Sequence, residues 1–141
     1  RLRADSSLMP SAIWELLRWD SPVQLNVRAA LRDVEILGES VGYGQIYTVL
    51  QGSGNRDEAA YPVADGLDVG RFVDRSTPPP LSFGWGPHHC LGAALARAEG
   101  EIVFGGLLDR FASLELIEAP SFRSSFTLRG LTSLNVACRS R

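Results

Sequence analysis

The chain has 141 residues, enough for one ordinary domain, and its 45% hydrophobic and 21% charged residues are typical of a soluble globular protein. Its formal net charge of −2 gives no reason to expect nucleic acid or an anionic membrane as a partner, and no apolar run is long enough to span a bilayer. Two cysteines, Cys90 and Cys138, do not make a secreted disulfide framework. We therefore expect a cytoplasmic protein, and the start at Arg1 instead of methionine indicates a processed product or a piece of something longer.

A helix is predicted over residues 7–19. Apolar side chains recur there at i, i+4 spacing, Pro10 suits the first turn, and a turn-forming Asp-Ser-Pro run ends the helix. Glu15 and Arg18 are three residues apart, so they are neighbours on the helix, off its main apolar stripe. Taken alone, such a pair is most often a solvated surface ion pair that contributes little stability.

Residues 23–50 contain short runs rich in β-branched and aromatic residues, separated by glycines. These runs predict two or three strands of a small antiparallel sheet. Residues 52–80 then show little periodicity and end in three consecutive prolines. A stretch this long without regular structure is uncommon in a compact domain unless it is functional or disordered, and its place directly before the segment of Cys90 favours a function.

The longest predicted helix covers residues 91–108 and is apolar on most sides. Because such a helix is normally buried, we expect other elements to pack against most of its sides. Gly92, Ala96 and Gly100 form a row of small residues on it, which lets another group approach the backbone closely. Short strands are predicted within residues 113–138, at 113–117, 126–128 and 133–136. The predicted fold class is therefore mainly α with a small antiparallel β-sheet.

The segment over residues 83–90 is tightly punctuated by glycine and proline and ends at Cys90. Its glycines permit unusual backbone conformations and the close approach of a flat ligand, and Pro87 stiffens the bend. A cysteine at the start of a helix lies near unpaired N–H groups and the positive end of the helix dipole. This position favours a thiolate, which can act as a nucleophile or as a metal ligand.

Four interpretations of Cys90 are open. A nucleophile needs a base, and the only histidines, His88 and His89, are too close in sequence to be placed freely beside it. A zinc ligand needs three or four protein partners, for which only Cys138 and the histidines are available. A buried cysteine that caps a helix is common but does not explain the glycines, the proline and the histidine together. The fourth is one thiolate on an iron that brings its other ligands with it, as in heme.

Residues 83–92 resemble the heme-thiolate signature of the cytochrome P-450 monooxygenases, bacterial type, because five positions satisfy the family pattern: Phe83, Gly86, His88, Cys90 and Gly92. Residues 15–18 are similar to the family's Glu-x-x-Arg helix, and residues 55–57 and 67–71 resemble its loop before the heme segment. Trp14 and Trp85 occupy positions where the family varies. The resemblance covers nearly all of residues 1–141 but only about the last third of the family's usual length, the C-terminal heme-binding portion.

The resemblance implies a role for each matching residue. Cys90 would be the axial ligand of the heme iron, and Arg28 and His88 would bind heme propionates, although Arg28 taken alone is an exposed strand residue. The cofactor-binding loop would further include Phe83, Gly84, Gly86 and Gly92. A buried ion network that holds this loop would consist of Glu15, Arg18 and Arg71. The chain offers no candidate for a catalytic acid or base.

The resemblance also implies heme b as cofactor and the insertion of one oxygen atom from O2 into a small organic substrate. Electrons would come from a donor such as ferredoxin or flavodoxin with its reductase. The family's long central helix and lid are absent from residues 1–141, so the chain would be inactive alone and would need the missing N-terminal portion or a second copy. Two other functions are open: a non-catalytic fragment with weak or no heme binding, and a module that docks a redox partner.

Overall fold

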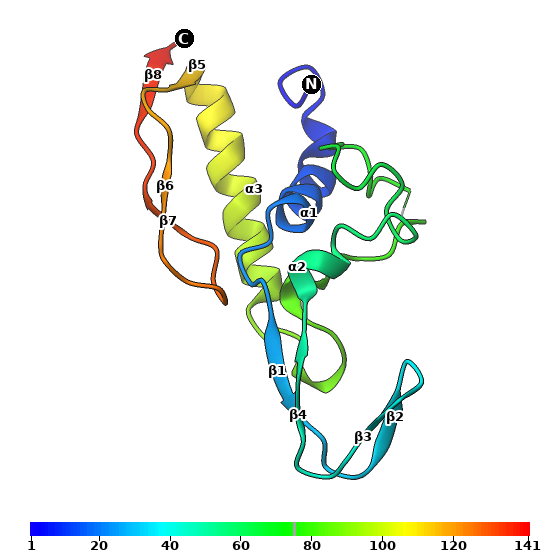
Figure 1. Ribbon diagram of the computed structural model, residues 1–141. Coiled ribbons are helices and arrows are strands. Elements are labelled where there is room, and N and C mark those ends of the chain that lie inside the picture. The colour runs from blue at the N-terminus through cyan, green and yellow to red at the C-terminus, as the bar shows by residue number, and fades with distance from the viewer. Residues whose placement is uncertain (75) are drawn as a thin grey trace.

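The computed structural model describes residues 1–74 and 76–141, and Figure 1 shows its helices and strands. The helices are α1 (Met9–Trp19), α2 (Gln51–Gly54) and α3 (Ala93–Arg110), with single 3-10 turns at Ser6–Leu8, Leu81–Phe83 and Gly86–His88. The strands are β1 (Asn26–Ala29), β2 (Val34–Ile36), β3 (Glu39–Val41), β4 (Ile46–Val49), β5 (Phe111–Leu116), β6 (Ser121–Phe122), β7 (Leu131–Ser133) and β8 (Val136–Ser140).

The strands lie in antiparallel pairs, β1 with β4, β2 with β3, β5 with β8 and β6 with β7. The small sheet expected over residues 23–50 is therefore two pairs, of which β2–β3 is a hairpin that projects away from the helices (Figure 1). Since 30% of the chain is helical and 23% is strand, the expected mainly α architecture is met only in part. The C-terminal residues contribute more strand than their short apolar runs indicate.

Some predicted elements differ from the observed ones. The long helix begins at Ala93 instead of residue 91, because Gly92 is its N-cap, and it continues to Arg110. Residues 126–128 do not form a strand, and Leu128 makes only an isolated bridge with Val23. A three-residue apolar run cannot by itself distinguish a strand from a loop. The irregular stretch 52–80 overlaps the short α2, and its residue 75 lies outside the described residues.

The best-buried part of the structure surrounds α1. Its apolar face buries Met9, Ala12 and Ile13, and Tyr61 and Ala64 of the long loop are buried as well. Helix α3 approaches this face at Gly100, the last of its row of small residues: a Cβ atom placed there would lie 3.2 Å from Cδ1 of Ile13. A larger side chain at position 100 would therefore push the two helices apart.

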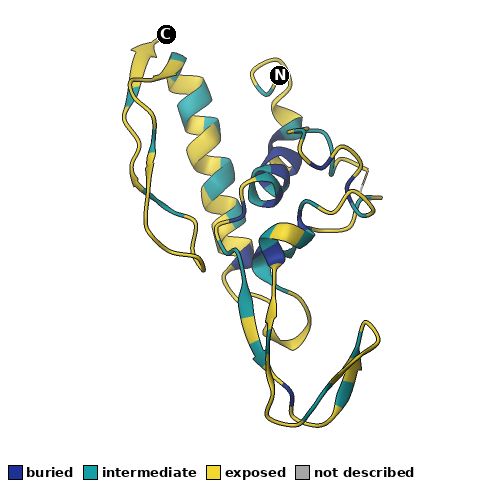
Figure 2. Ribbon diagram, viewed as in Figure 1, coloured by how far each residue is buried: buried dark blue, intermediate teal, exposed yellow. Residues whose placement is uncertain are grey.

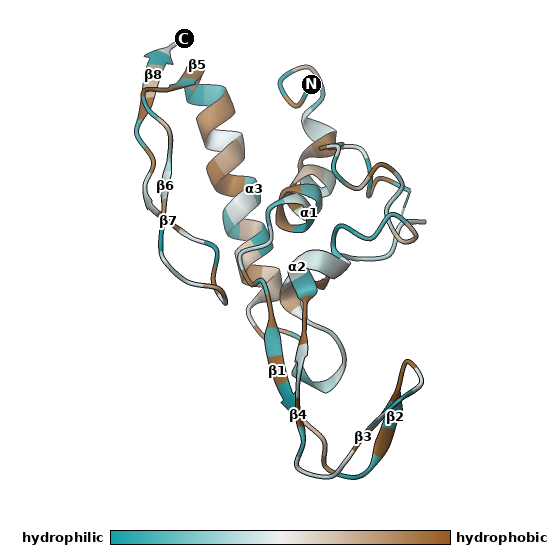
Figure 3. Ribbon diagram, in the orientation of Figure 1, coloured by the Kyte–Doolittle hydropathy of each residue, from teal (hydrophilic) through white to brown (hydrophobic). Residues whose placement is uncertain are grey.

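The rest of α3 and the C-terminal strands are open to solvent. Figure 2 shows α3 mostly exposed, and Figure 3 shows hydrophobic residues along the same helix. The exposed apolar side chains include Leu91, Leu95, Ile102, Val103 and Phe104 on or next to α3, and Leu116, Ile117, Phe126 and Leu134 after it. An apolar surface of this extent is unusual for a monomeric protein and is typical of a surface that takes part in an interaction. Among the described residues, every helix is too short or too polar to cross a bilayer.

Candidate functional site

Glu15 and Arg18 form an ion pair in the centre of the structure, and both side chains are 0% exposed. Arg18 binds the carboxylate with two atoms, since its Nε lies 2.7 Å from Oε2 and its Nη2 lies 2.8 Å from Oε1 of Glu15. Their spacing of three residues on α1 brings the two side chains together. The reading of this pair as a solvated surface pair is therefore wrong, because loop residues that the helix pattern does not show cover it completely.

Arg71 completes this cluster from the long loop. Its Nε donates to both carboxylate oxygens of Glu15, at 3.2 Å and 3.1 Å, and its side chain is only 9% exposed. The remaining donors of the two arginines bind backbone carbonyls of the same loop, those of Asn55, Pro62, Val63, Ala64 and Gly66. We call the three side chains of Glu15, Arg18 and Arg71 the ion lock. It fastens an irregular loop to α1 through charge-assisted hydrogen bonds.

The electrostatics of the ion lock favour an ionised Glu15. Burial of the carboxyl acts to raise its pKa, but hydrogen bonds from Arg18, from the N–H of Asp68 and from Arg71, together with the charge of Arg18, outweigh burial. The net result is a pKa of Glu15 below its ordinary value of 4.5. Two arginines around one carboxylate also leave the cluster with a positive charge, which Tyr61 contacts through its ring face, 5.3 Å from Cζ of Arg18.

Asn55 connects the ion lock to the segment before Cys90, and the sequence pattern did not single out this role. The side chain is completely buried, and the Asn55 carbonyl accepts from Arg18 at 2.7 Å. Its Oδ1 accepts from the N–H of Leu81 at 2.7 Å, and its Nδ2 donates to Ser82 Oγ at 2.9 Å. Ser82 in turn donates to the carbonyl of Leu17 on α1 at 2.6 Å. The ion lock thus reaches residues 83–90, which we call the cysteine loop, indirectly, through the Asn55 amide and the Ser82 hydroxyl.

The cysteine loop turns on two glycines in the left-handed region of backbone conformation. Gly84 and Gly86 both have φ of 72°, which other residues adopt only with strain. The loop closes where the N–H of Cys90 donates to the carbonyl of Phe83 at 2.9 Å. No atom lies within 4 Å of the place where a Cβ on Gly86 would stand, so this side of the loop is open to a flat group.

Cys90 itself is exposed and lies before the first residue of α3, Ala93. The N-cap of this helix is Gly92, and no side chain caps it. The interpretation of Cys90 as a buried helix cap is therefore wrong on both counts. Within residues 1–74 and 76–141 there is also no group of three or more His, Cys, Asp or Glu side chains that could together hold a metal ion.

A groove of about 320 Å³ opens beside the thiol. Its lining residues come from α1, the turn after it, β1, α2 and the cysteine loop: Leu17, Pro22, Val23, Asn26, Gln51, Ser82, Phe83, Gly84, His88 and Cys90. The structure thus brings Cys90, His88, Phe83 and Gly84 to one cavity. Arg28 is not among the described lining residues, but it lies on the same face of β1 as Asn26, two residues away, and its Nη1 donates to the carbonyl of Val27.

Two further residues next to this site are not in the predicted set. Trp14, one residue before Glu15, packs edge-on against Phe83 with ring centroids 6.0 Å apart. Arg97 of α3 stacks on the same indole, with its Cζ 4.3 Å from the ring centroid. The signal that could have shown them is the large aromatic at position 14, a position where the similar family varies.

The Cytochrome P450 family model matches residues 2–133, and the chain belongs to this family. The chain is 41% identical over 135 residues to putative cytochrome P450 140 of Mycobacterium tuberculosis, which covers 96% of this chain and 30% of that protein. It is 40% identical over 136 residues to cytochrome P450 CYP199A2 of Rhodopseudomonas palustris, and this alignment covers 96% of this chain and 32% of that protein.

Solved structures agree with this assignment. P450BioI, in complex with an acyl carrier protein ligated to hexadec-9Z-enoic acid, superposes with a TM-score of 0.91 at 37% identity, over 98% of this chain and 35% of that one. CYP108D1 of Novosphingobium aromaticivorans superposes with a TM-score of 0.90 at 35% identity, over 100% and 33%. The chain therefore spans about a third of the length of the relatives that it matches. The apolar face of α3 is consistent with a piece that packs against further polypeptide.

Proposed function

We propose that this chain carries the cysteine-ligand side of a heme-thiolate monooxygenase, with Cys90 as the axial ligand of heme b. When bound, heme supplies reductive activation of O2, which a thiolate ligand promotes by donating electron density. The observation that carries the proposal is the Cys90 thiol. The thiol is exposed and lies beside an open groove. It belongs to the loop that turns at Gly84 and Gly86, and hydrogen bonds of Ser82 and Asn55 connect the start of this loop to the ion lock. One such thiol suffices for an iron that brings its other ligands.

The residues around the groove fit this cofactor. Gly84 and Gly86 keep side chains away from the face of the loop, so that a flat ring system can lie against the backbone. Gly92 lies directly beside the thiol, since a Cβ there would stand 3.8 Å from Sγ of Cys90, an ordinary contact distance. His88 at the groove and Arg28 on the neighbouring strand supply donors for propionate groups.

Phe83 and the ion lock have supporting roles in this proposal. The ring of Phe83 lines the groove and, by its contact with Trp14, fixes the first residue of the loop. Glu15, Arg18 and Arg71 hold the preceding loop against α1, so that Leu81 and Ser82 enter the cysteine loop from a fixed position. The chain's own contribution is therefore to hold one sulfur atom in place and to exclude other conformations of its loop.

The activity of the whole protein would be oxygenation of a small organic substrate, with electrons from a ferredoxin or flavodoxin and its reductase. The substrate of a relative can be presented by a carrier, as in the P450BioI complex with its acyl carrier protein. Because the chain spans about a third of its relatives, we expect it to need the missing N-terminal portion, or a second copy in its place, before it oxygenates any substrate. Its cytoplasmic location stays a prediction.

An optical titration tests the proposal. Heme is added to the wild-type chain and to two matched variants, Cys90→Ser and Cys138→Ser, and each sample is reduced and treated with carbon monoxide. The wild type and Cys138→Ser should show the strongly red-shifted Soret band of a thiolate-ligated heme, and Cys90→Ser should not, since Cys138 lies on β8, away from the groove. The same band in all three proteins, or its loss only in Cys138→Ser, would refute the assignment of the ligand.

A second function is a non-catalytic piece that binds heme weakly or not at all, or that serves as an interaction module. The exposed apolar residues of α3 favour it, because a face of this kind associates with other polypeptide whether or not a cofactor is bound. The titration separates the two: a chain that is folded by circular dichroism and takes up no heme would support the second function.

A further inference from the structure

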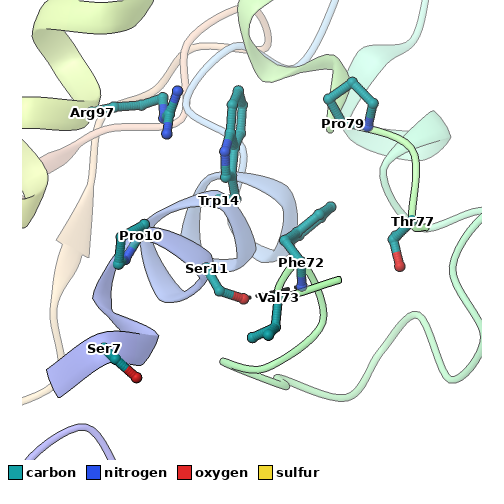
Figure 4. A pocket seen from close by; sticks show the side chains of 9 residues that line it. All are labelled: Ser7, Pro10, Ser11, Trp14, Phe72, Val73, Thr77, Pro79 and Arg97. Atoms are coloured by element: carbon teal, nitrogen blue, oxygen red, sulfur yellow. Dashed lines mark hydrogen bonds between the residues drawn. The ribbon is translucent and has the colours of Figure 1, made fainter. Parts of the chain in front are cut away.

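A second groove, of about 460 Å³, lies along α1, and Trp14 stands in its wall (Figure 4). The figure shows the indole between Arg97, which comes from α3, and Phe72, which comes from the long loop. Ser11, one turn before Trp14, accepts a hydrogen bond from the N–H of Phe72 at 3.0 Å. Three chain segments therefore meet on one face of α1.

The contacts of Trp14 lie on both sides of Cys90 in sequence. Its ring packs edge-on against Phe83, 6.0 Å away, and Phe83 lies seven residues before the cysteine. The guanidinium of Arg97 lies over the same ring, 4.3 Å from the centroid, and Arg97 lies seven residues after the cysteine. One side chain thus holds the entry to the cysteine loop and the first turns of the helix that leaves it.

The contact with Phe83 reaches the backbone of the cysteine directly. The carbonyl of Phe83 accepts the hydrogen bond of the Cys90 N–H at 2.9 Å, and the ring of Phe83 also packs against His89, 6.4 Å away. A displacement of Phe83 therefore displaces the acceptor that fixes Cys90. The ion lock, by contrast, reaches the cysteine loop only through Asn55 and Ser82.

The contact with Arg97 is the more telling one. Its Nε is buried and has no hydrogen-bond partner among the described residues, so the face of the indole is the favourable neighbour of this part of the guanidinium. A cation over a tryptophan face gains more when it is desolvated. The stack therefore ties α1 to the start of α3.

We propose that Trp14 and Arg97 are positioning residues that clamp the cysteine loop from both ends and so set the position of the Cys90 thiol. This inference rests on the proposed function for its meaning, since the thiol is the proposed iron ligand, but the clamp itself is a property of the chain without cofactor. Neither residue touches the groove beside Cys90, so they act through Phe83 and through α3.

Helix α1 also supplies a matched control. Trp19 stacks with Arg56, whose Cζ lies 4.9 Å from its ring, and Trp19 Nε1 donates to the carbonyl of Asp65. This second Trp–Arg stack holds the long loop only and has no contact with residues 83 or 97 among the described interactions. A purely structural role of a Trp–Arg stack on α1 should therefore appear equally in both.

The experiment compares Trp14→Leu, Arg97→Met and Trp19→Leu in the Cys138→Ser background. Two conservative variants, Trp14→Phe and Arg97→Lys, keep a ring and a cation respectively. The first readout needs no heme: it is the rate at which Cys90 of the folded chain reacts with an aromatic disulfide reagent. The second is the fraction of heme in the red-shifted, thiolate-type carbon monoxide form.

We expect Trp14→Leu and Arg97→Met to change the thiol reaction rate by about fivefold and to lower the thiolate-type fraction, while Trp14→Phe and Arg97→Lys, which keep a weaker cation–ring contact, change both readouts less. Trp19→Leu should lose stability and keep both readouts. The clamp is overturned if Trp14→Leu and Arg97→Met keep the wild-type thiol rate, or if Trp19→Leu changes it equally. Arg97 is only half-buried, so Arg97→Met keeps the test open if Trp14→Leu fails to fold. A wild type without a thiolate-type band would instead contradict the proposed function. The reaction rates of the Cys90 thiol, measured without heme, would still test the clamp.

Discussion

The two faces of this chain are built in opposite ways. Around α1, the charged groups of Glu15 and Arg18 are completely buried and bound to one another, to Arg71 and to loop carbonyls. Along the outer side of α3, apolar residues such as Ile102 and Val103 are 73% and 55% exposed. The charged groups around α1 thus find their partners within the chain, whereas the apolar side chains on the outer side of α3 remain exposed.

The contrast between the two faces indicates where the chain's own stability comes from. A buried ion pair contributes little by itself compared with apolar packing, but removing one partner is costly because it leaves an uncompensated charge. The ion lock therefore acts less as a source of stability than as a device that permits one loop conformation only. The open face of α3 adds nothing to the stability of the separate chain, since exposed apolar groups gain only when they are covered.

The largest expected effect comes from Arg18→Leu. The substitution leaves the carboxylate of Glu15 without its bidentate partner and several loop carbonyls without a donor, and we expect a loss of about 3–5 kcal/mol in the free energy of unfolding. Urea unfolding followed by circular dichroism measures this loss. Arg1→Leu is the control, because the Arg1–Asp68 pair is 63% and 51% exposed and should contribute less than about 1 kcal/mol. Equal losses in the two variants would show that the ion lock is an ordinary surface pair.

Asn55→Ala should have the next largest effect. It removes the acceptor of the Leu81 N–H and the donor to Ser82 inside the structure, and each buried polar group left unsatisfied costs about 1–3 kcal/mol. The matched control is Asn135→Ala, whose amide donates to Glu118 at an exposed position. We expect the melting temperature to fall clearly in Asn55→Ala and hardly at all in Asn135→Ala. Similar melting temperatures would argue against Asn55 as the link to the cysteine loop.

The ion lock also predicts a pH dependence. Because the folded-state pKa of Glu15 lies below its ordinary value of 4.5, the unfolded chain takes up this proton first as pH falls. The contribution of Glu15 is therefore complete above about pH 5 and is lost as the pH falls through the lowered pKa. Unfolding free energies of the wild type and Glu15→Gln, measured from about pH 6 to pH 3, should converge at the acid end. Parallel curves would contradict the lowered pKa.

The smallest expected effects on the free energy of unfolding come from Gly86→Ala in the cysteine loop and Gly105→Ala in α3. Gly86→Ala places a side chain at φ of 72° and should cost about 1 kcal/mol through backbone strain alone, since nothing lies within 4 Å. Gly105→Ala lies inside α3, also with nothing within 4 Å, and should stabilise the chain by up to about 1 kcal/mol. Opposite signs in chemical unfolding support the loop conformation, and the same sign would oppose it.

The predictable part of this structure is the part that short-range patterns determine. The i, i+4 rows indicate α1, and the row of small residues at positions 92, 96 and 100 indicates that another element approaches α3. The structure shows this approach at Gly100, next to Ile13 of α1. The burial of Glu15 was not predictable from its helix, because the residues that cover it lie about 50 positions away in an irregular loop. The roles of Asn55 and Trp14 escaped for the same reason, since side-chain contacts between distant segments leave no local period.

The proposal that Cys90 is the axial ligand of the heme iron is tested most directly by identifying the atom that the protein donates to the iron. X-ray absorption at the iron edge of the heme-loaded chain reports whether a sulfur atom is bound to the metal. We expect one sulfur neighbour in the wild type and in Cys138→Ser, and none in Cys90→Ser, because Cys90 is the cysteine that lines the groove. A sulfur neighbour that persists in Cys90→Ser, or its absence from the heme-loaded wild type, would contradict the assignment of Cys90 as the ligand.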